Sequence, residues 1–216
     1  MPELAAERVD YVGDHLLESA APDEPYALFD RWLADAFAAR DRGELAEPTA
    51  MVVATSAGGR PRARTVLLKD LRDDGFRFFT NYDSAKAGEI AANPAVALHF
   101  GWHAIHRQVR IEGTAEKVSR GESETYFATR PRGSQLGAWA SSQSSEVGSL
   151  AELEASYAAA ASRFGGGEVP CPPHWGGFLV RPTEIEFWQG QPSRMHDRLV
   201  YRLAGHGAWT LTRLAP

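Results

Sequence analysis

The sequence is poor in cysteine and in lysine, and it has no long hydrophobic run. Cys171 is the only cysteine, which excludes an intrachain disulfide framework and a zinc site built from several cysteines. No window of about 18 consecutive apolar residues occurs, so we expect no transmembrane helix and no membrane partner. The N-terminus has acidic residues and no apolar stretch, unlike a secretory signal. These features favour a cytoplasmic protein.

Several signatures of common function classes are also absent. The net charge of −5 argues against a general nucleic-acid binder. The sequence has no G-x-G-x-x-G after a strand, no P-loop and no G-x-S-x-G motif. His99, His103 and His106 lie close together, but they have no carboxylate at helical ligand spacing, so we expect no metal site.

The chain divides into a short polar segment and a long patterned one. Residues 1–24 are weakly patterned and predict a flexible N-terminal arm, a possible lid. Residues 25–216 contain no repeat and no low-complexity linker, so we expect a single domain there. An apolar stripe of 3.6-residue period predicts a helix from Pro25 to about Arg42, with Asp23 as its N-cap.

Strands dominate the remainder and follow one another as hairpins. The patterns predict strands at 50–56, 61–68, 76–81, 95–102, 107–118, 178–188, 198–203 and 208–213. They predict helices at 84–92, 122–129, 136–141 and 150–164. Hairpins rather than alternating βαβ units indicate a mainly β fold, an antiparallel sheet or barrel surrounded by helices.

Two of the three lysines stand beside groups that suit a phosphate. In the strand that ends at Lys69, Arg62 and Arg64 share one face, and Arg64 and Lys69 could address an anion at the sheet edge. Lys86 follows Ser84 where a strand ends and a helix begins, and a helix N-terminus favours anions. The alternatives are a solvated basic face in the first case and an ordinary N-cap with an exposed lysine in the second.

Two further groups of residues predict a binding site. Tyr126 and Arg130 share a helix face and Ser134 follows, so the three offer hydroxyl and guanidinium donors for a phosphate, unless this is only a basic turn. If residues 194–198 are extended, Arg194, His196 and Arg198 point the same way. Such cations repel one another unless an anion or an electron-rich ring faces them, the alternative being an exposed edge strand.

Taken together, these residues resemble the pyridoxamine/pyridoxine 5′-phosphate oxidase family over most of the chain, from about Tyr26 to Pro216. The resemblance rests on the segments 64–69, 107–109, 130–135, 137–139, 143–145, 175–178, 185–190 and 194–198. It implies a split β-barrel homodimer with FMN at the subunit interface. It also implies oxidation of pyridoxine or pyridoxamine 5′-phosphate to pyridoxal 5′-phosphate, with O₂ reduced to H₂O₂.

The resemblance also implies roles for individual residues. FMN binding would fall to Arg64, Thr65, Val66, Leu67, Leu68, Lys69, Phe79, Thr80, Lys86, Gln108, Gln143, Ser144, Trp188 and Arg198. Substrate binding would fall to Lys69, Tyr126, Arg130, Ser134, Arg194 and His196, with Arg8 and Tyr11 in an N-terminal lid. Arg194 and His196 would serve catalysis by placing the substrate ring on the flavin. At position 85 the family often has arginine, whereas this chain has Ala85.

Two other functions remain open at this stage. One is a related FMN oxidase of another aromatic substrate, of the phenazine-biosynthesis type. The other is a non-enzymatic flavin- or B6-binding protein, whose flavin the phosphorylated vitamin would not reduce.

Overall fold

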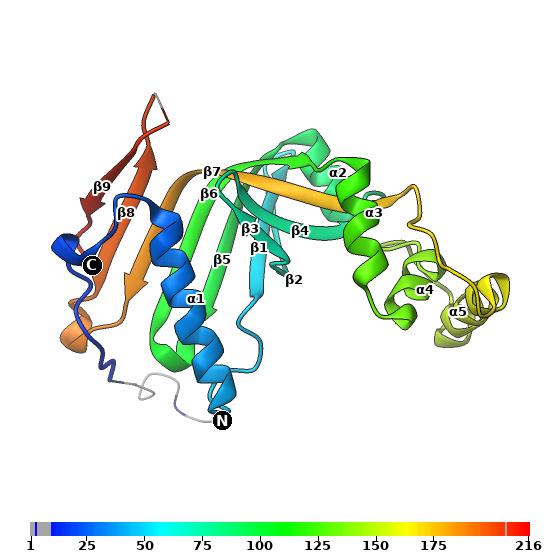
Figure 1. The fold of residues 1–216 in the computed structure, drawn as a ribbon, viewed down its shortest axis with the longest axis horizontal. Helices are drawn as coiled ribbons and strands as arrows, with labels where there is room; N and C mark the ends of the chain where they lie inside the picture. The colour runs from blue at the N-terminus through cyan, green and yellow to red at the C-terminus, as the bar shows by residue number, and fades with distance from the viewer. Residues whose placement is uncertain (1–2, 4–9, 206) are drawn as a thin grey trace. The chain divides into compact units, whose positions relative to one another are not determined.

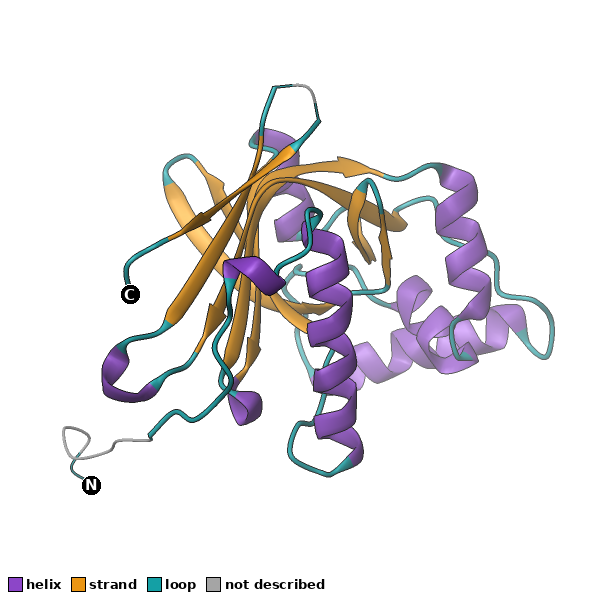
Figure 2. Ribbon diagram, turned by 60° about the vertical axis from the view of Figure 1, so that its left-hand side comes forward, coloured by secondary structure: helices purple, strands orange, loops and turns teal. Residues whose placement is uncertain are grey.

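A nine-stranded, mostly antiparallel sheet with surrounding helices forms the framework, as the hairpin pattern predicts (Figures 1 and 2). The computed structural model describes residues 3, 10–205 and 207–216. The strands are β1 (Ala50–Ala57), β2 (Arg60–Leu67), β3 (Asp70–Arg72), β4 (Gly75–Asn81), β5 (Ala95–Trp102), β6 (Arg107–Lys117), β7 (Trp175–Gln189), β8 (Asp197–Leu203) and β9 (Trp209–Arg213). Their order is β2-β1-β5-β6-β7-β4-β3, with β8 paired to β7 and β9 to β8.

Five α-helices and three short 3₁₀ segments accompany the sheet within the described residues. The α-helices are α1 (Pro25–Asp41), α2 (Ala85–Ala92), α3 (Arg120–Thr129), α4 (Arg132–Ala140) and α5 (Leu150–Phe164). The 3₁₀ segments are η1 (Glu18–Ala20), η2 (His103–Ile105) and η3 (Pro192–Arg194). No described helix has the length and apolar character needed to cross a membrane.

The contacts within the chain group into two compact units, and the single domain expected for residues 25–216 stays a prediction. Unit 1 comprises residues 1–53, 97–113 and 182–216, and unit 2 comprises residues 54–96 and 114–181. Strands β1, β5, β6 and β7 each contribute residues to both units. A sequence pattern of continuous strands therefore gives no sign of this division.

In unit 1, helix α1 buries an aromatic stripe. Phe29 packs against Phe100 with ring centroids 5.1 Å apart, and Trp32 meets Phe187 edge-to-face at 5.2 Å. Burial of each such side chain contributes roughly 1.5–3 kcal/mol. The predicted N-cap is wrong by one residue: Glu24 is the N-cap, without a side-chain hydrogen bond, and proline follows it. Proline suits this first position because its ring presets the helical φ and its missing N–H has no partner there.

In unit 2, tight turns and caps set the ends of the elements. Gly58 and Gly59 join β1 to β2 with φ of 58° and 72°, left-handed values that glycine adopts without steric cost. Ser119 begins α3 with a capping box, in which its hydroxyl and the Glu122 carboxylate each accept the other residue's backbone N–H. This cap explains why α3 begins earlier than predicted, at Arg120 rather than residue 122.

Unit 2 has its own apolar cluster beside strand β4. Phe127, Leu136 and Trp175 are buried together, and Phe79 and Tyr126 pack against them. Phe79 stacks on Tyr126 at 4.0 Å between ring centroids. In the β4–β7 pairing, Phe79 lies opposite Gly177, which leaves room for its ring. This cluster anchors α3 and α4 beside the end of β4, where the predicted phosphate-binding residues lie.

Candidate functional site

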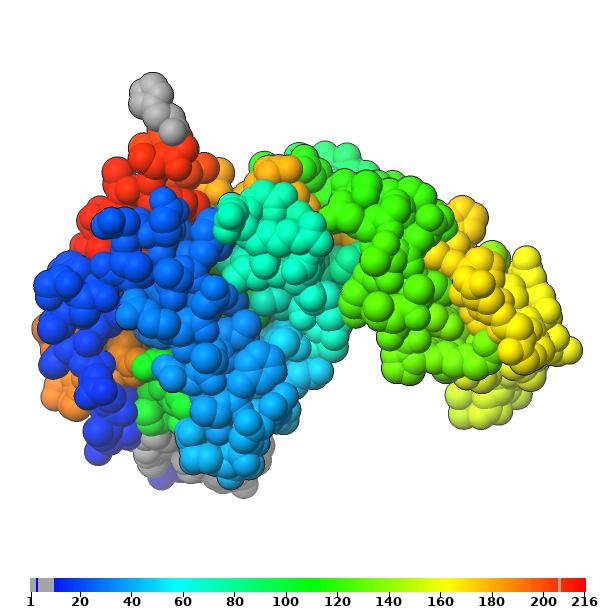
Figure 3. Space-filling model, in the orientation of Figure 1, coloured from blue at the N-terminus to red at the C-terminus, as the bar shows by residue number. Residues whose placement is uncertain are grey.

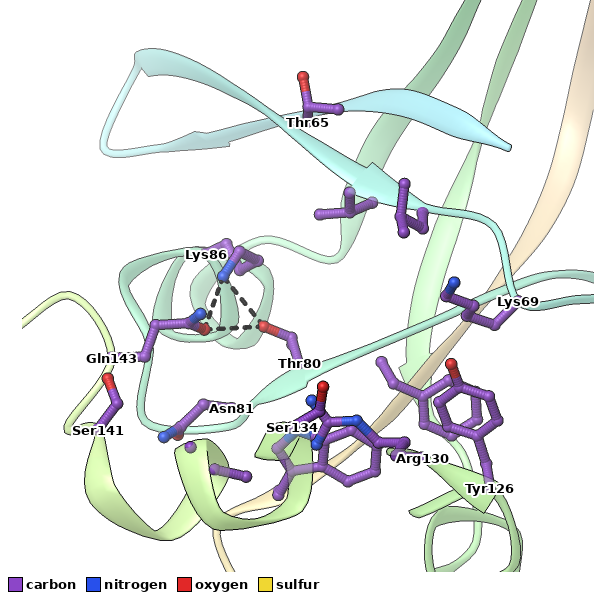
Figure 4. A pocket seen from close by; sticks show the side chains of 16 residues that line it. Thr65, Lys69, Thr80, Asn81, Lys86, Tyr126, Arg130, Ser134, Ser141 and Gln143 are labelled. Carbon is purple, nitrogen blue, oxygen red and sulfur yellow. Dashed lines mark hydrogen bonds between the residues drawn. The ribbon is translucent and has the colours of Figure 1, made fainter. Parts of the chain in front are cut away.

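A cavity of about 460 Å³ in unit 2 collects many of the predicted site residues (Figure 4). It is lined by the predicted residues Thr65, Val66, Leu67, Lys69, Phe79, Thr80, Lys86, Tyr126, Arg130, Ser134 and Gln143. The lining comes from β2, β4, α2, α3, α4, the first residue of β7 and the loops after β2, α3 and α4. Residues predicted from separate sequence segments are thus brought into one cavity.

One part of the cavity is built around the buried ammonium of Lys86. Its Nζ donates to Thr80 Oγ1 and Gln143 Oε1, both at 3.0 Å, and to Ser84 Oγ at 3.3 Å. Burial lowers the pKa of Lys86, and the nearby charge of Arg64 lowers it further. The alternative of an ordinary N-cap with an exposed lysine is therefore wrong, because Lys86 is buried. Ser84 is the N-cap of α2, but its hydroxyl donates to the Asn81 carbonyl instead of capping the helix.

A second part is built around the guanidinium of Arg130. Its Cζ lies 4.7 Å from the Trp175 ring centroid and 5.4 Å from that of Phe127. Its Nη1 is buried and has no hydrogen-bond partner among the described residues. Burial lowers the pKa of Arg130 and raises that of Tyr126. An unsatisfied, buried N–H of a cation is costly, and an anionic oxygen beside it would remove that cost.

Ser134 and Lys69 complete the donors near Arg130. Both side chains are exposed and line the same cavity, Ser134 from the first turn of α4 and Lys69 just after β2 (Figure 4). Within the described residues, no salt bridge reaches Lys69, Lys86 or Arg130. The cavity therefore combines several hydroxyl groups with three cations that form no ion pair with a carboxylate in the described part of the chain, a donor set that suits phosphate.

Arg64 is held differently from these three cations. Its Nη2 lies 2.6 Å from Glu89 Oε2 and its Nη1 donates to Thr55 Oγ1 at 2.7 Å. Arg62 reaches the other oxygen of Glu89 at 2.8 Å, which confirms that Arg62 and Arg64 share a strand face. Burial disfavours the charged form of Glu89, but hydrogen bonds from Thr55 and Arg64 lower its pKa overall. Arg64 is not among the residues that line the cavity.

Two other predicted cofactor residues of unit 2 also lie outside the cavity lining. The Leu68 side chain is 5% exposed and belongs to the core. Ser144 is exposed, with a left-handed φ of 75°, directly after the cavity residue Gln143. Such a conformation is uncommon for a residue other than glycine and occurs often at functional sites.

The remaining predicted residues belong to unit 1, and four aromatic rings gather there. Trp188 and His196 lie 4.6 Å apart between ring centroids, and Tyr11 meets them at 5.8 Å and 5.5 Å. Tyr11 also meets His106 at 4.9 Å. Arg8, the other predicted lid residue, lies outside the described residues.

His196 is partly buried, and its ring has a defined hydrogen bond. The backbone N–H of Gln191 donates to His196 Nδ1 at 3.1 Å, which leaves the proton of the neutral ring on Nε2. Burial lowers the pKa of His196, and the positive charge of Arg194 lowers it further. The neutral ring can therefore donate a hydrogen bond from Nε2.

Residues 194–198 are not extended throughout, so the condition under which Arg194, His196 and Arg198 would point the same way is not met. Ser193 and Arg194 have φ of 55° and 62°, and strand β8 begins only at Asp197. Arg198 therefore does not continue a row of cations. Its Nε lies 2.6 Å from Glu186 Oε1 across the β7–β8 pair, so a carboxylate neutralises it. Gln108, also predicted for FMN, is hydrogen-bonded to His99 at 3.0 Å.

Sequence reasoning did not assign a site role to several residues of the cavity. These are Asn81, Gly137, Ala138, Ser141 and Trp175. Four of them lie within or next to the sequence motifs described above, so their position beside a motif could have identified them. His106 directly precedes the segment 107–109, but its contact with Tyr11 joins distant parts of the chain and could not be predicted from that position. No group of three or more His, Cys, Asp or Glu within the described residues could hold a metal ion.

The fold and this cavity define a mostly antiparallel sheet protein whose cavity has a donor set that suits a phosphate, and comparison with known proteins specifies the family. Residues 38–163 match the family model for pyridoxamine 5′-phosphate oxidase, and residues 175–216 match that for the pyridoxine 5′-phosphate oxidase C-terminal dimerisation region. The chain belongs to the pyridoxamine 5′-phosphate oxidase family and carries its dimerisation region.

Curated relatives match the chain along its whole length. The pyridoxine/pyridoxamine 5′-phosphate oxidase of Burkholderia multivorans is 51% identical, with 100% of each chain covered. That of Rubrobacter xylanophilus is 53% identical over 99% of this chain and 97% of its own. Among solved structures, PhzG from Burkholderia lata in complex with tetrahydrophenazine-1-carboxylic acid has a TM-score of 0.86 at 30% identity, covering 94% of this chain and 98% of that one.

Proposed function

We propose that this protein is an FMN-dependent oxidase that converts pyridoxine 5′-phosphate or pyridoxamine 5′-phosphate to pyridoxal 5′-phosphate, reducing O₂ to H₂O₂. The observation that carries the proposal is the buried Arg130 Nη1 without a partner, in a cavity that also contains Tyr126, Ser134 and Lys69. A phosphorylated substrate supplies the anionic oxygens that this group lacks. Relatives that are 51% and 53% identical to this chain along nearly their whole length are named pyridoxine/pyridoxamine 5′-phosphate oxidase.

The residues of this chain fit FMN as well as the substrate. Lys86, Thr80 and Gln143 present a buried cation and polar groups beside the N-terminus of α2, where free N–H groups favour a phosphate. Trp188 and Arg198 are the corresponding candidates in unit 1. When bound, FMN supplies an isoalloxazine ring that accepts the hydrogen and two electrons lost by the substrate carbon.

The protein side chains contribute binding and orientation. Arg130, Tyr126, Ser134 and Lys69 grip the substrate phosphate, and this remote binding energy aligns the reacting carbon. His196 donates from Nε2 to the polar edge of the substrate ring, and the planar Arg194 guanidinium lies over that ring. For the alcohol substrate, C4′ loses a hydride and its hydroxyl loses a proton. For the amine substrate, water then releases ammonia.

A homodimer with a split-barrel fold completes the proposal. The matched dimerisation region contains Trp188, Arg194, His196 and Arg198, so the site residues of unit 1 lie in the segment that serves assembly. We propose that each active site takes residues from both subunits. Dilution or mutation that dissociates the dimer should therefore release FMN, measured by light scattering and flavin fluorescence. A monomer that keeps its full FMN content would contradict shared sites.

The decisive experiment is anaerobic mixing of the FMN-loaded protein with pyridoxine 5′-phosphate. We expect the flavin absorbance to bleach, then to return when O₂ is admitted, with one pyridoxal 5′-phosphate and one H₂O₂ formed for each substrate oxidised. Unphosphorylated pyridoxine is the matched control and should bleach the flavin far more slowly. A flavin that stays oxidised with the phosphorylated vitamin would leave only the binding-protein alternative or an oxidase of another substrate.

The structural likeness to PhzG favours one alternative, an oxidase of a phosphate-free aromatic compound. A tricyclic aromatic acid has no group that needs Arg130, Tyr126 and Ser134 together. The same anaerobic assay with a reduced phenazine carboxylic acid distinguishes the two. Bleaching of the flavin by the B6 phosphate and not by the phenazine supports the proposal, and the opposite result replaces it.

A further inference from the structure

The carboxylate of Asp197 collects four hydrogen bonds in unit 1. Oδ2 accepts from His15 Nδ1 at 3.0 Å, from the Leu16 backbone N–H at 3.1 Å and from Gln191 Nε2 at 3.0 Å. Oδ1 accepts from Arg213 Nη1 at 2.6 Å. The residue is 6% exposed. In the sequence, Asp197 lies between His196 and Arg198, two residues assigned to the site.

The first connection from Asp197 runs to His196. Gln191 donates its side-chain amide to Asp197 and its backbone N–H to His196 Nδ1. The same side-chain amide also donates to the Asp14 carbonyl at 3.1 Å. Gln191 is 3% exposed, so its orientation is set by these bonds and not by water. The carboxylate thus holds the residue that determines which nitrogen of His196 carries the proton.

The second connection runs to the N-terminal segment 10–24, which we call the strap. Besides the bonds from His15 and Leu16, Arg213 joins Asp197 to the strap residue Glu18, with Nε–Oε1 at 2.6 Å and Nη2–Oε2 at 2.8 Å. Hydrogen bonding to Arg213 lowers the pKa of Glu18 to about 2. Burial disfavours the charged form of Asp197, but its bonds from Arg213 and His15 lower its pKa overall.

The strap, in turn, places Tyr11 on the ring cluster. Gly190 makes this approach possible, because a Cβ there would lie 2.9 Å from Tyr11 Cγ and 3.0 Å from His106 Cβ. Tyr11 covers the rings of Trp188 and His196. The described part of the predicted flexible arm is therefore bonded to unit 1 at residues 14–18 and packed against it at Tyr11.

We propose that Asp197 is a positioning residue for substrate binding, which orients His196 through Gln191 and holds Tyr11 over the ring cluster through the strap. The proposal rests on the proposed function, since it assigns His196 to the substrate. A carboxylate suits the role because all four contacts donate to it. Asparagine has the same size but has only one acceptor oxygen, and its amide NH₂ would face donors.

The test compares Asp197→Asn with Glu184→Gln. Glu184 also forms an ion pair across β7 and β8, with Arg202 at 2.7 Å, but among the described residues its ion pairs reach only Arg202 and Arg110, and neither the strap nor His196. We expect Asp197→Asn to raise the KM for pyridoxine 5′-phosphate about tenfold, with a smaller change in kcat and unchanged FMN content. Glu184→Gln should leave the KM unchanged. An unchanged KM in Asp197→Asn would overturn the proposal.

Coupling to Tyr11 separates positioning from a general loss of stability. If Asp197 acts partly through Tyr11, the KM increases of Asp197→Asn and Tyr11→Ala are less than multiplicative in the double variant. Fully multiplicative increases in KM would show that Asp197 does not act on substrate binding through the strap. If Asp197→Asn does not fold, the pair His15→Ala and Glu18→Gln removes two strap contacts, leaves Asp197 in place, and should raise the KM in the same Tyr11-dependent way.

A measurement that does not depend on turnover tests whether Asp197 holds the strap, even if the proposed function is wrong. Hydrogen exchange at the Leu16 amide should accelerate at least tenfold in Asp197→Asn, while exchange along β8 stays slow. Equal exchange in the two proteins would show that the carboxylate does not hold the strap. A wild-type enzyme that fails to oxidise the B6 phosphate would instead refute the proposed function and leave the exchange result intact.

Discussion

The cations in the cavity of unit 2 and those of the β7–β8 pair in unit 1 differ in whether a carboxylate lies beside them. Lys86 is buried and Arg130 is partly buried, and no salt bridge within the described residues neutralises either of them. Arg198 and Arg202 each pair with a glutamate, at 2.6 Å and 2.7 Å. Desolvation is costly for a cation without a counterion, so an anionic ligand would stabilise the first pair, whereas each member of the second pair already has a carboxylate beside it.

Other arginines of unit 1 also pair with carboxylates. Figure 3 shows helix α1 along one face of unit 1, and its Asp35 pairs with Arg107 at 2.5 Å. Asp197 and Glu18 likewise hold Arg213. In this chain, then, the position of the carboxylates distinguishes binding arginines from structural ones better than the position of the arginines does.

Arg130→Ala should give the largest effect, because it removes the cation without a partner. We expect the KM for pyridoxine 5′-phosphate to rise roughly ten- to a hundred-fold, the equivalent of about 1.5–3 kcal/mol for a charge-assisted contact. FMN affinity should change little. Steady-state kinetics and flavin titration measure the two quantities. Loss of FMN with an unchanged KM would assign Arg130 to the cofactor phosphate instead.

Arg132→Ala is the matched control for Arg130→Ala. Arg132 is exposed and donates to the Gly165 and Gly167 carbonyls, so it is already satisfied within the protein. Its removal should leave the KM within about twofold, since exposed contacts contribute little. Equal effects of the two substitutions would mean that the missing partner of Arg130 has no consequence for binding.

Arg194→Leu should give the next largest effect and tests the strained turn of unit 1. Leucine keeps much of the apolar bulk but removes the planar cation, so we expect turnover to fall by about tenfold or more with FMN retained. Met195→Leu changes the exposed neighbouring side chain and should be close to wild type. A parallel loss of flavin in Arg194→Leu would show that the residue serves the cofactor or the fold.

Local patterns predicted the elements well where one period continued without interruption. The boundaries of β5 and α5 agree with the prediction, because alternation and a helical stripe with a following glycine define them. The short β3 was missed, since three residues give no period. The turn at Ser193 and Arg194 was missed as well, because left-handed conformations of residues other than glycine have no reliable sequence signal.

The site was predictable as a set of residues but not as a set of contacts. Tyr126, Arg130 and Ser134 share a cavity as predicted, but not on one helix face: Tyr126 lies on α3, Arg130 is the extended C-cap of α3, and Ser134 lies in the first turn of α4. The carboxylates that neutralise Arg64 and Arg198 come from α2 and β7. Such pairings depend on tertiary structure, so the sequence could not tell which arginines are free to bind a ligand.

Ala85→Arg should give the smallest effect. It adds a cation without a counterion at the start of α2, in the unit whose cavity already holds such cations. Ala85 is exposed at the first position of α2, next to Lys86, where free N–H groups favour an anion. We expect FMN to bind about 1 kcal/mol more tightly, roughly fivefold, because arginine can form a bidentate contact with phosphate at a partly exposed position. The KM for the B6 phosphate should stay nearly the same.

Ala91→Arg adds the same charge near the other end of α2 and should leave FMN affinity unchanged. Titration of FMN into the apo-protein measures both, and flat or weaker binding in Ala85→Arg would show that the start of α2 does not face the FMN phosphate.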